Sequence, residues 1–142
     1  GDVVDLIARL EINEYNGSRN VNIFIQDLRY SGFREDRYFA AKTAYEDYRA
    51  GRVDRKLLCR MIPERDELMK VYDILRNTRS LSAAEMIADR SGINACKFRI
   101  ITDVFGEFGL AETDLPGDGI RLLPAAGKAD LSKSKVIAAL KA

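Results

Sequence analysis

The sequence contains no histidine and only two cysteines among its 142 residues. Without histidine the chain lacks the usual general base, the commonest transition-metal ligand and every catalytic triad that depends on an imidazole. Cys59 and Cys96 are far apart in the sequence, so a structural zinc site is not expected. We expect both thiols to be reduced and to lie in apolar surroundings, which is typical of a cytoplasmic protein.

Long apolar runs and an excess of one charge are also missing. No run approaches the roughly 20 residues of a membrane-spanning helix, and no signal peptide is expected. The net charge is +1, from 23 basic and 22 acidic residues, without the strong positive excess of a dedicated nucleic-acid-binding protein. The sequence begins inside an apparent strand and without methionine. We therefore expect a piece of a longer protein, which would carry any catalytic machinery.

Alternating apolar residues predict a two-stranded antiparallel ribbon over residues 3–29. Every second residue is apolar from Val4 to Ile12, and the pattern returns from Val21 to Ile25. Asn16-Gly17 between them is a strong hairpin signal, because both residues tolerate positive φ. An isolated hairpin is marginal in water, so its apolar face must pack on the helices that follow or on strands absent from this sequence.

Residues 37–51 predict a helix, and a basic segment follows it. Tyr38, Tyr45 and Tyr48 recur on one helical face, either as part of a core or as a platform on which bases stack; burial is the favoured interpretation. Residues 49–60 hold five basic side chains and one acidic one. This densest positive patch of the chain is either a solvated loop or a non-specific track for phosphates.

Residues 63–142 show the pattern of a winged helix. Pro63 opens a first helix, Ser82 and Glu85 match a capping box for a second, and Asn94 caps a third that ends at Gly109. Two helices joined by a short turn containing glycine form the helix-turn-helix arrangement. The remaining predicted elements are two wing strands at 110–113 and 120–123 and a final helix at 132–141.

The third of these helices is the candidate recognition helix. Its predicted apolar face consists of Phe98, Ile101, Phe105 and Phe108. Its outward positions include Lys97 and Thr102, but also Asp103 and Glu107. DNA readers place basic and amide side chains there, and carboxylates would be repelled by phosphates. Packing or protein docking is therefore favoured over reading of duplex DNA.

The ribbon also resembles a known family. Residues 10–29, LEINEYNGSRNVNIFIQDLR, resemble the stretch near the end of the oligonucleotide-binding (OB) domain of RecJ-type single-strand-specific exonucleases. The matching positions are Asn13, Glu14, Asn16, Gly17, Asp27 and Arg29. Residues 63–66, 71–72, 105–110 and 130–132 are similar to the extra C-terminal domain of some bacterial RecJ proteins. We thus predict an α+β fold, with a hairpin from an OB domain (1–30), a helix and basic linker (31–62) and a mainly α-helical winged-helix-like domain (63–142).

The resemblance implies that the parent enzyme degrades single-stranded DNA in the 5′→3′ direction, using manganese or magnesium held by a DHH phosphoesterase core. None of those motifs is present in this sequence. We therefore expect no catalytic residue, metal site or cofactor here, and an inactive module. Its implied role is to assist the nuclease in DNA repair and recombination, by holding single-stranded DNA or by docking a protein partner.

Six side chains are candidates for binding single-stranded DNA, since OB surfaces combine aromatic stacking with a basic groove. They are Tyr15, Arg19, Arg29, Arg52, Arg55 and Lys56. Tyr15 could equally brace the turn. The expected partners are single-stranded DNA, the rest of the parent nuclease, the acidic tail of single-strand-binding protein at residues 49–60, and a second copy at the ribbon edge. Two alternatives stay open: a stand-alone winged-helix transcription regulator, and a structural or dimerisation module without nucleic-acid contact.

Overall fold

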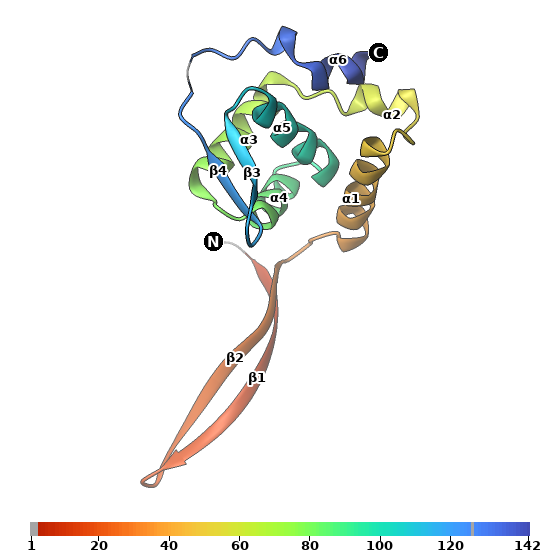
Figure 1. Cartoon of the computed structure of the whole chain (residues 1–142). Coiled ribbons are helices and arrows are strands. Elements are labelled where there is room, and N and C mark those ends of the chain that lie inside the picture. Colours follow the sequence, from red (N-terminus) through yellow and green to blue (C-terminus); the bar gives the residue numbers. More distant parts are fainter. Residues whose placement is uncertain (1–2, 126) are drawn as a thin grey trace. The chain divides into compact units, whose positions relative to one another are not determined.

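The computed structural model describes residues 3–125 and 127–142. The chain forms two compact units, Gly1–Arg34 and Glu35–Ala142. The first is an antiparallel β-hairpin and the second is mainly helical with a smaller hairpin, which confirms the predicted α+β fold (Figure 1). Residues 35–62 belong to the same unit as the helices that follow them. No helix in the described part of the chain is long and apolar enough to cross a membrane.

The first unit pairs β1 (Val4–Tyr15) with β2 (Ser18–Tyr30), as the alternation predicted. Asn16 and Gly17 connect the strands with φ values of 50° and 77°. Two consecutive positive φ angles define a type I′ turn, whose twist matches that of the flanking strands. The turn therefore fixes which residues face one another across the hairpin.

A β-bulge keeps one face of this hairpin apolar along its length. The register changes after Ile7 in β1, and Gln26 is the extra residue in β2. Apart from Phe24, the apolar residues of β2 are odd-numbered up to Ile25 and even-numbered at Leu28 and Tyr30, so the extra residue brings both sets to one side. The resulting apolar face consists of Val4, Leu6, Ala8, Leu10, Ile12, Val21, Ile23, Ile25, Leu28 and Tyr30.

The second unit contains a winged-helix core with three additional helices. Helices α3, α4 and α5 followed by the β3–β4 hairpin form the winged helix, and α1, α2 and α6 are the additions (Figure 1). The bounds are α1 (Glu35–Arg49), α2 (Arg55–Arg60), α3 (Arg65–Asn77), α4 (Leu81–Arg90), α5 (Ala95–Glu107), β3 (Ala111–Leu115), β4 (Gly119–Leu122), the 3-10 turn η1 (Leu131–Lys133) and α6 (Lys135–Lys141).

Apolar side chains are buried on two sides of α5. Phe98 and Ile101 lie in the main core with α3, α4 and the small hairpin. Cys96 and Ile100 lie in a second cluster with Leu140 of α6 and half-buried side chains of α1 and α2. The tyrosine stripe of α1 belongs to this packing: Tyr38 is buried, and Tyr45 and Tyr48 pack on the second cluster. The core interpretation of that stripe is confirmed.

The predicted capping box at Ser82 and Glu85 is wrong. Helix α4 begins at Leu81, and the Ser80 hydroxyl accepts the cap hydrogen bond from the Ala83 amide at 3.2 Å. The start therefore lies earlier than the pattern indicated, so Glu85 belongs to the second turn of α4 and not to the first, and it is fully buried. A buried carboxylate needs hydrogen-bond or charge partners. The Glu85 carboxylate has them on other helices, so it does not cap the start of α4.

Two other helix starts also differ from the prediction. Pro63 precedes the N-cap residue of α3, Glu64, whose amide donates to the Glu67 carboxylate at 2.8 Å. Helix α6 begins at Lys135, after the Ser134 hydroxyl that caps it. In both helices the capping side chain determines the first helical residue. Neighbouring residues in each segment are also able to cap a helix, so the sequence alone did not identify the start.

The expectation that both cysteines are buried holds only for Cys96. Burial raises the pKa of its thiol to about 11. Cys59 is exposed, because α2 turns the neighbouring Leu58 towards the second cluster instead.

Asp118 in the β3–β4 turn joins that hairpin to the start of α4. Its carboxylate accepts from the Ser82 amide at 2.8 Å and from the Ser80 hydroxyl at 3.0 Å, and these bonds, the amide first, hold its pKa below the ordinary value. We expect Asp118→Ala to lower the free energy of unfolding by about 1 kcal/mol at neutral pH. Because the folded-state pKa is depressed, this stabilisation is present above the ordinary pKa near ~3.9 and is lost as the pH falls through the folded value.

Urea denaturation of wild type and variant at about pH 7 and about pH 3 measures the effect. Asp114→Ala removes an exposed carboxylate from the same hairpin and serves as the control, with a change within about 0.5 kcal/mol. An equal deficit of the Asp118 variant at both pH values would contradict the role of the charge.

Candidate nucleic-acid interface

The hairpin face opposite the apolar one is polar and carries two of the predicted site residues. Facing pairs place Tyr15 opposite Ser18 at the turn end and Arg29 opposite Asp5 at the other end. Arg19 lies opposite Glu14, at the turn end of the apolar face. The register thus puts Tyr15 and Arg29 on one surface and separates Arg19 from them.

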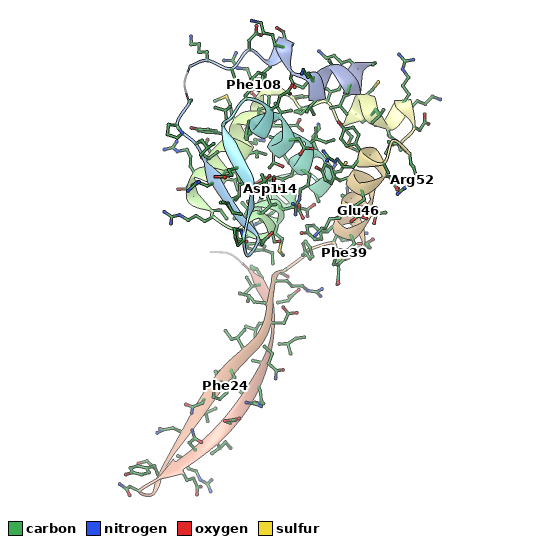
Figure 2. All side chains as sticks on the ribbon, in the orientation of Figure 1. Phe24, Phe39, Glu46, Arg52, Phe108 and Asp114 are labelled. Atoms are coloured by element: carbon green, nitrogen blue, oxygen red, sulfur yellow. The ribbon has the colours of Figure 1, made fainter. Side chains whose placement is uncertain are left out.

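Phe24 and Arg9 form an aromatic and cationic pair on this polar face. The Arg9 guanidinium lies 5.4 Å from the centroid of the Phe24 ring, a cation–π distance. Phe24 is 43% exposed and its side chain projects from the middle of β2 (Figure 2). Sequence analysis missed this pair, although counting outwards from the two-residue turn places Arg9 opposite Phe24. Aromatic rings beside arginines are the elements on which single-stranded bases and phosphates bind.

Tyr15 is the second exposed ring on the polar face. It is 77% exposed, so it does not brace the turn by burial. Six residues along the strand separate it from the position of the Phe24 pair, which is about 20 Å at the usual rise of a strand. Two rings at that separation can contact different bases of one extended strand.

The predicted arginines of the hairpin form exposed ion pairs. The Arg19 guanidinium contacts the Glu14 carboxylate, and Arg29 lies 3.7 Å from Asp5. Exposed pairs of this kind contribute about 0–1 kcal/mol, so a phosphate can replace the carboxylate at little cost. Both arginines therefore remain candidates for contacts to a DNA backbone.

The basic segment 49–60 is not a simple loop, because its second half forms α2. Asp54 caps this helix by accepting from the Lys56 amide at 3.4 Å. Arg52 donates twice to the Asp47 carboxylate, at 2.8 and 3.0 Å. Arg55 and Lys56 lie exposed in the first turn of α2. These three candidates belong to the helical unit, and the hairpin candidates belong to the other.

The predicted outward face of α5 is largely covered. Thr102 is 4% exposed, and its hydroxyl donates to the Arg99 carbonyl at 2.7 Å. The Lys97 ammonium lies 2.8 Å from the Glu67 carboxylate of α3 and is mostly buried. A helix that reads the major groove must present an open face. The expectation that Thr102 points outward is wrong, and α5 presents no such face.

The two carboxylates of α5 bind neighbouring helices, although Glu107 is also exposed to solvent, as predicted. Asp103 accepts from the Tyr45 hydroxyl of α1 at 2.9 Å, and burial raises the pKa of both groups. Glu107 accepts from the Ser134 hydroxyl and the Lys135 amide, each at 2.6 Å, at the start of α6. Those two hydrogen bonds hold the Glu107 pKa below its ordinary value. The acidic residues are explained by packing of α1 and α6 on α5.

The described residues do not assemble the ligands of a divalent metal. Over 3–125 and 127–142 no three carboxylate or thiolate side chains come together. This part of the chain therefore does not fit the manganese or magnesium centre that the family resemblance implies for the parent enzyme. No protein-family model, curated protein or solved structure matches this chain.

Proposed function

We propose that this chain is a non-catalytic C-terminal module of a RecJ-like 5′→3′ single-stranded-DNA exonuclease that acts in DNA repair and recombination in the cytoplasm. The observation that carries the proposal is the apolar face of the first hairpin. Its aliphatic side chains from Val4 to Leu28 are 39–68% exposed, apart from the half-buried Ala8. A two-stranded ribbon with such a face gains its stability when further strands cover it, as in a closed barrel.

As part of an OB barrel, this hairpin would contribute to holding DNA. The apolar face would lie inside the barrel, and the polar face would form part of its outer surface. Tyr15, Phe24 and Arg9 would then meet a single strand by stacking and by charge, with Arg29 at the far end of the same face. Arg52, Arg55 and Lys56 would supply further phosphate contacts from the helical unit.

The covered surface of α5 weighs against a stand-alone transcription regulator. Helices α1 and α6 pack on the side of α5 that a DNA reader would insert into the major groove. A structural module without nucleic-acid contact remains the competing function, and it predicts no salt-dependent binding to any nucleic acid.

Fluorescence anisotropy with labelled oligo-dT and a matched duplex, at about 50 and 200 mM salt, tests the proposal. We expect tighter binding to the single strand, and weaker binding as salt rises. Phe24→Ala should weaken binding roughly 5- to 100-fold, the usual effect of removing one stacked ring. The chain is kept below the concentration at which sedimentation detects dimers.

Phe39→Ala is the matched control. It removes an exposed ring from α1, outside the hairpin, and should leave the affinity unchanged (Figure 2). Absence of binding, equal binding to the duplex, or an equal effect of both substitutions would count against DNA holding by the hairpin.

A further inference from the structure

An apolar groove of about 720 Å³ runs between α3 and the β3–β4 hairpin. Its apolar lining comes chiefly from Tyr72, Leu75, Leu115, Ile120, Leu122 and Pro124. Three arginines complete the lining, Arg76 and Arg79 from the end of α3 and just beyond it and Arg121 from β4. None of the described residues that line the groove is acidic. It therefore combines space for apolar side chains with a surplus of positive charge.

The positive charge of this groove is only partly balanced. Arg76 lies 3.5 Å from Asp73, and Arg121 lies 2.5 Å from Glu112 across the small hairpin. Both pairs are exposed, so an incoming carboxylate can compete for either arginine. The guanidinium of Arg79 is exposed and has no ion pair or hydrogen bond within the described part of the chain. It is a cation without a counter-charge at the groove.

A second pocket, of about 260 Å³, continues this surface along α3. Met69 and Tyr72 line it together with Leu131, and Arg65 stands beside them. Tyr72 lines both pockets. Four residues of α3 that line the two pockets lie at the spacing of one helical face: Arg65, Met69, Tyr72 and Arg76. This gives one continuous surface of about 17 Å, with apolar side chains at its centre and arginines at both ends.

We propose that this α3 surface docks a peptide segment of another protein in which acidic residues flank apolar anchors. The apolar anchors fill the two pockets beside Tyr72, and the carboxylates pair with Arg79, Arg76 and Arg65. Charge complementarity identifies the partner, since the lining holds arginines and no acid. The inference gives a site to the protein-docking half of the proposed function, and to that extent it rests on it.

The same lining argues against nucleic acid as the occupant. Bases bind on open aromatic faces, whereas most of the groove wall is aliphatic. Tyr72, its one aromatic residue, is half-buried and stands edge-to-face against Phe105, with ring centroids 6.2 Å apart. Apolar side chains of a peptide fit such a wall better than bases do.

The test uses a fluorescein-labelled peptide in which two leucines are spaced among aspartates, titrated with the full chain. We expect saturable binding that weakens with salt, and weaker binding when the aspartates become asparagines or the leucines become serines. Arg79→Glu should weaken it at least roughly tenfold, because it reverses the uncompensated charge. Lys141→Glu reverses a charge at the exposed end of α6, outside both pockets, and should leave the affinity unchanged.

Several results would overturn the inference. They are binding no tighter than that of the asparagine and serine peptides, equal effects of the two charge reversals, and displacement of the peptide by oligo-dT. Arg79→Gln provides a second variant if the reversal disturbs folding, and it should weaken binding in the same direction. Peptide binding that persists in Phe24→Ala separates this inference from the DNA-holding role, because either can fail while the other stands.

Discussion

Replacing Glu85 by alanine is expected to lower the free energy of unfolding by about 3–5 kcal/mol. The carboxylate is 0% exposed, accepts from the Tyr38 hydroxyl at 2.6 Å and contacts the Arg99 guanidinium, with the Lys42 ammonium 3.8 Å away. It thus connects α1 to α4 and α5. Its removal leaves the partly buried Arg99 without its counter-charge and removes the contacts of Tyr38 and Lys42 that connect α1 to α4.

Urea denaturation followed by far-ultraviolet circular dichroism reports the loss, because the signal comes from the helices. Tyr38→Phe deletes one hydrogen bond to the same carboxylate and should cost about 1 kcal/mol. Glu46→Ala removes an exposed glutamate of α1 and should change stability by no more than about 0.5 kcal/mol (Figure 2). If Glu85→Ala were no more harmful than Glu46→Ala, the buried carboxylate would not hold the helices together.

The role of Glu85 could not be predicted from the local sequence. Ser80 and Ser82 both precede apolar residues, and only Ser82 has a glutamate at the spacing of a capping box. The choice of the wrong serine assigned Glu85 to the first turn as a capping residue, whereas it lies in the second turn of α4 and is buried. Tyr38, which supplies the buried hydroxyl, is distant in sequence, so no local pattern reveals that a carboxylate is needed in the core.

The covering of α5, by contrast, left a signal that sequence analysis did not use. Besides the stripe of Phe98, Ile101 and Phe105, the helix carries Cys96 and Ile100 one turn apart on another side. Two apolar stripes indicate a helix buried on both sides, and the second packs against α1 and α6. Which elements cover that side depends on contacts between distant segments, and the sequence alone does not specify these.

Alternation of apolar residues and turn chemistry predicted most of the first hairpin. They predicted the strands, the Asn16-Gly17 turn and the apolar face up to Ile25. The bulge at Gln26 was missed, because an extra residue looks like an interruption of the alternation unless the partner strand is considered. The Phe24 pair was missed for the same reason: a facing pair is a property of two strands, and each strand was read separately.

The second large expected effect is the loss of stability when Phe98 is replaced by alanine, compared with the same change at Phe108. The sequence pattern predicted both rings on one apolar face of α5. Phe98 is 0% exposed in the main core, whereas Phe108 is the half-buried residue at which the helix ends. Phe98→Ala should lower the free energy of unfolding by about 3–5 kcal/mol, the usual cost of an aromatic cavity in a core. Phe108→Ala removes the same atoms from a site that solvent reaches and should cost about 1 kcal/mol.

Urea denaturation of the two variants under identical conditions gives this comparison directly. The difference is expected because burial, and not membership of a helical pattern, determines what a deleted ring costs. Gly109 follows with a φ of 66°, so the helix ends at Phe108, and the stripe that Phe98 begins is not continued beyond it. If both substitutions lowered the free energy of unfolding equally, the core would extend past the end of α5. The apolar pattern, including Phe108, would then predict the cost of a deleted ring better than its burial does.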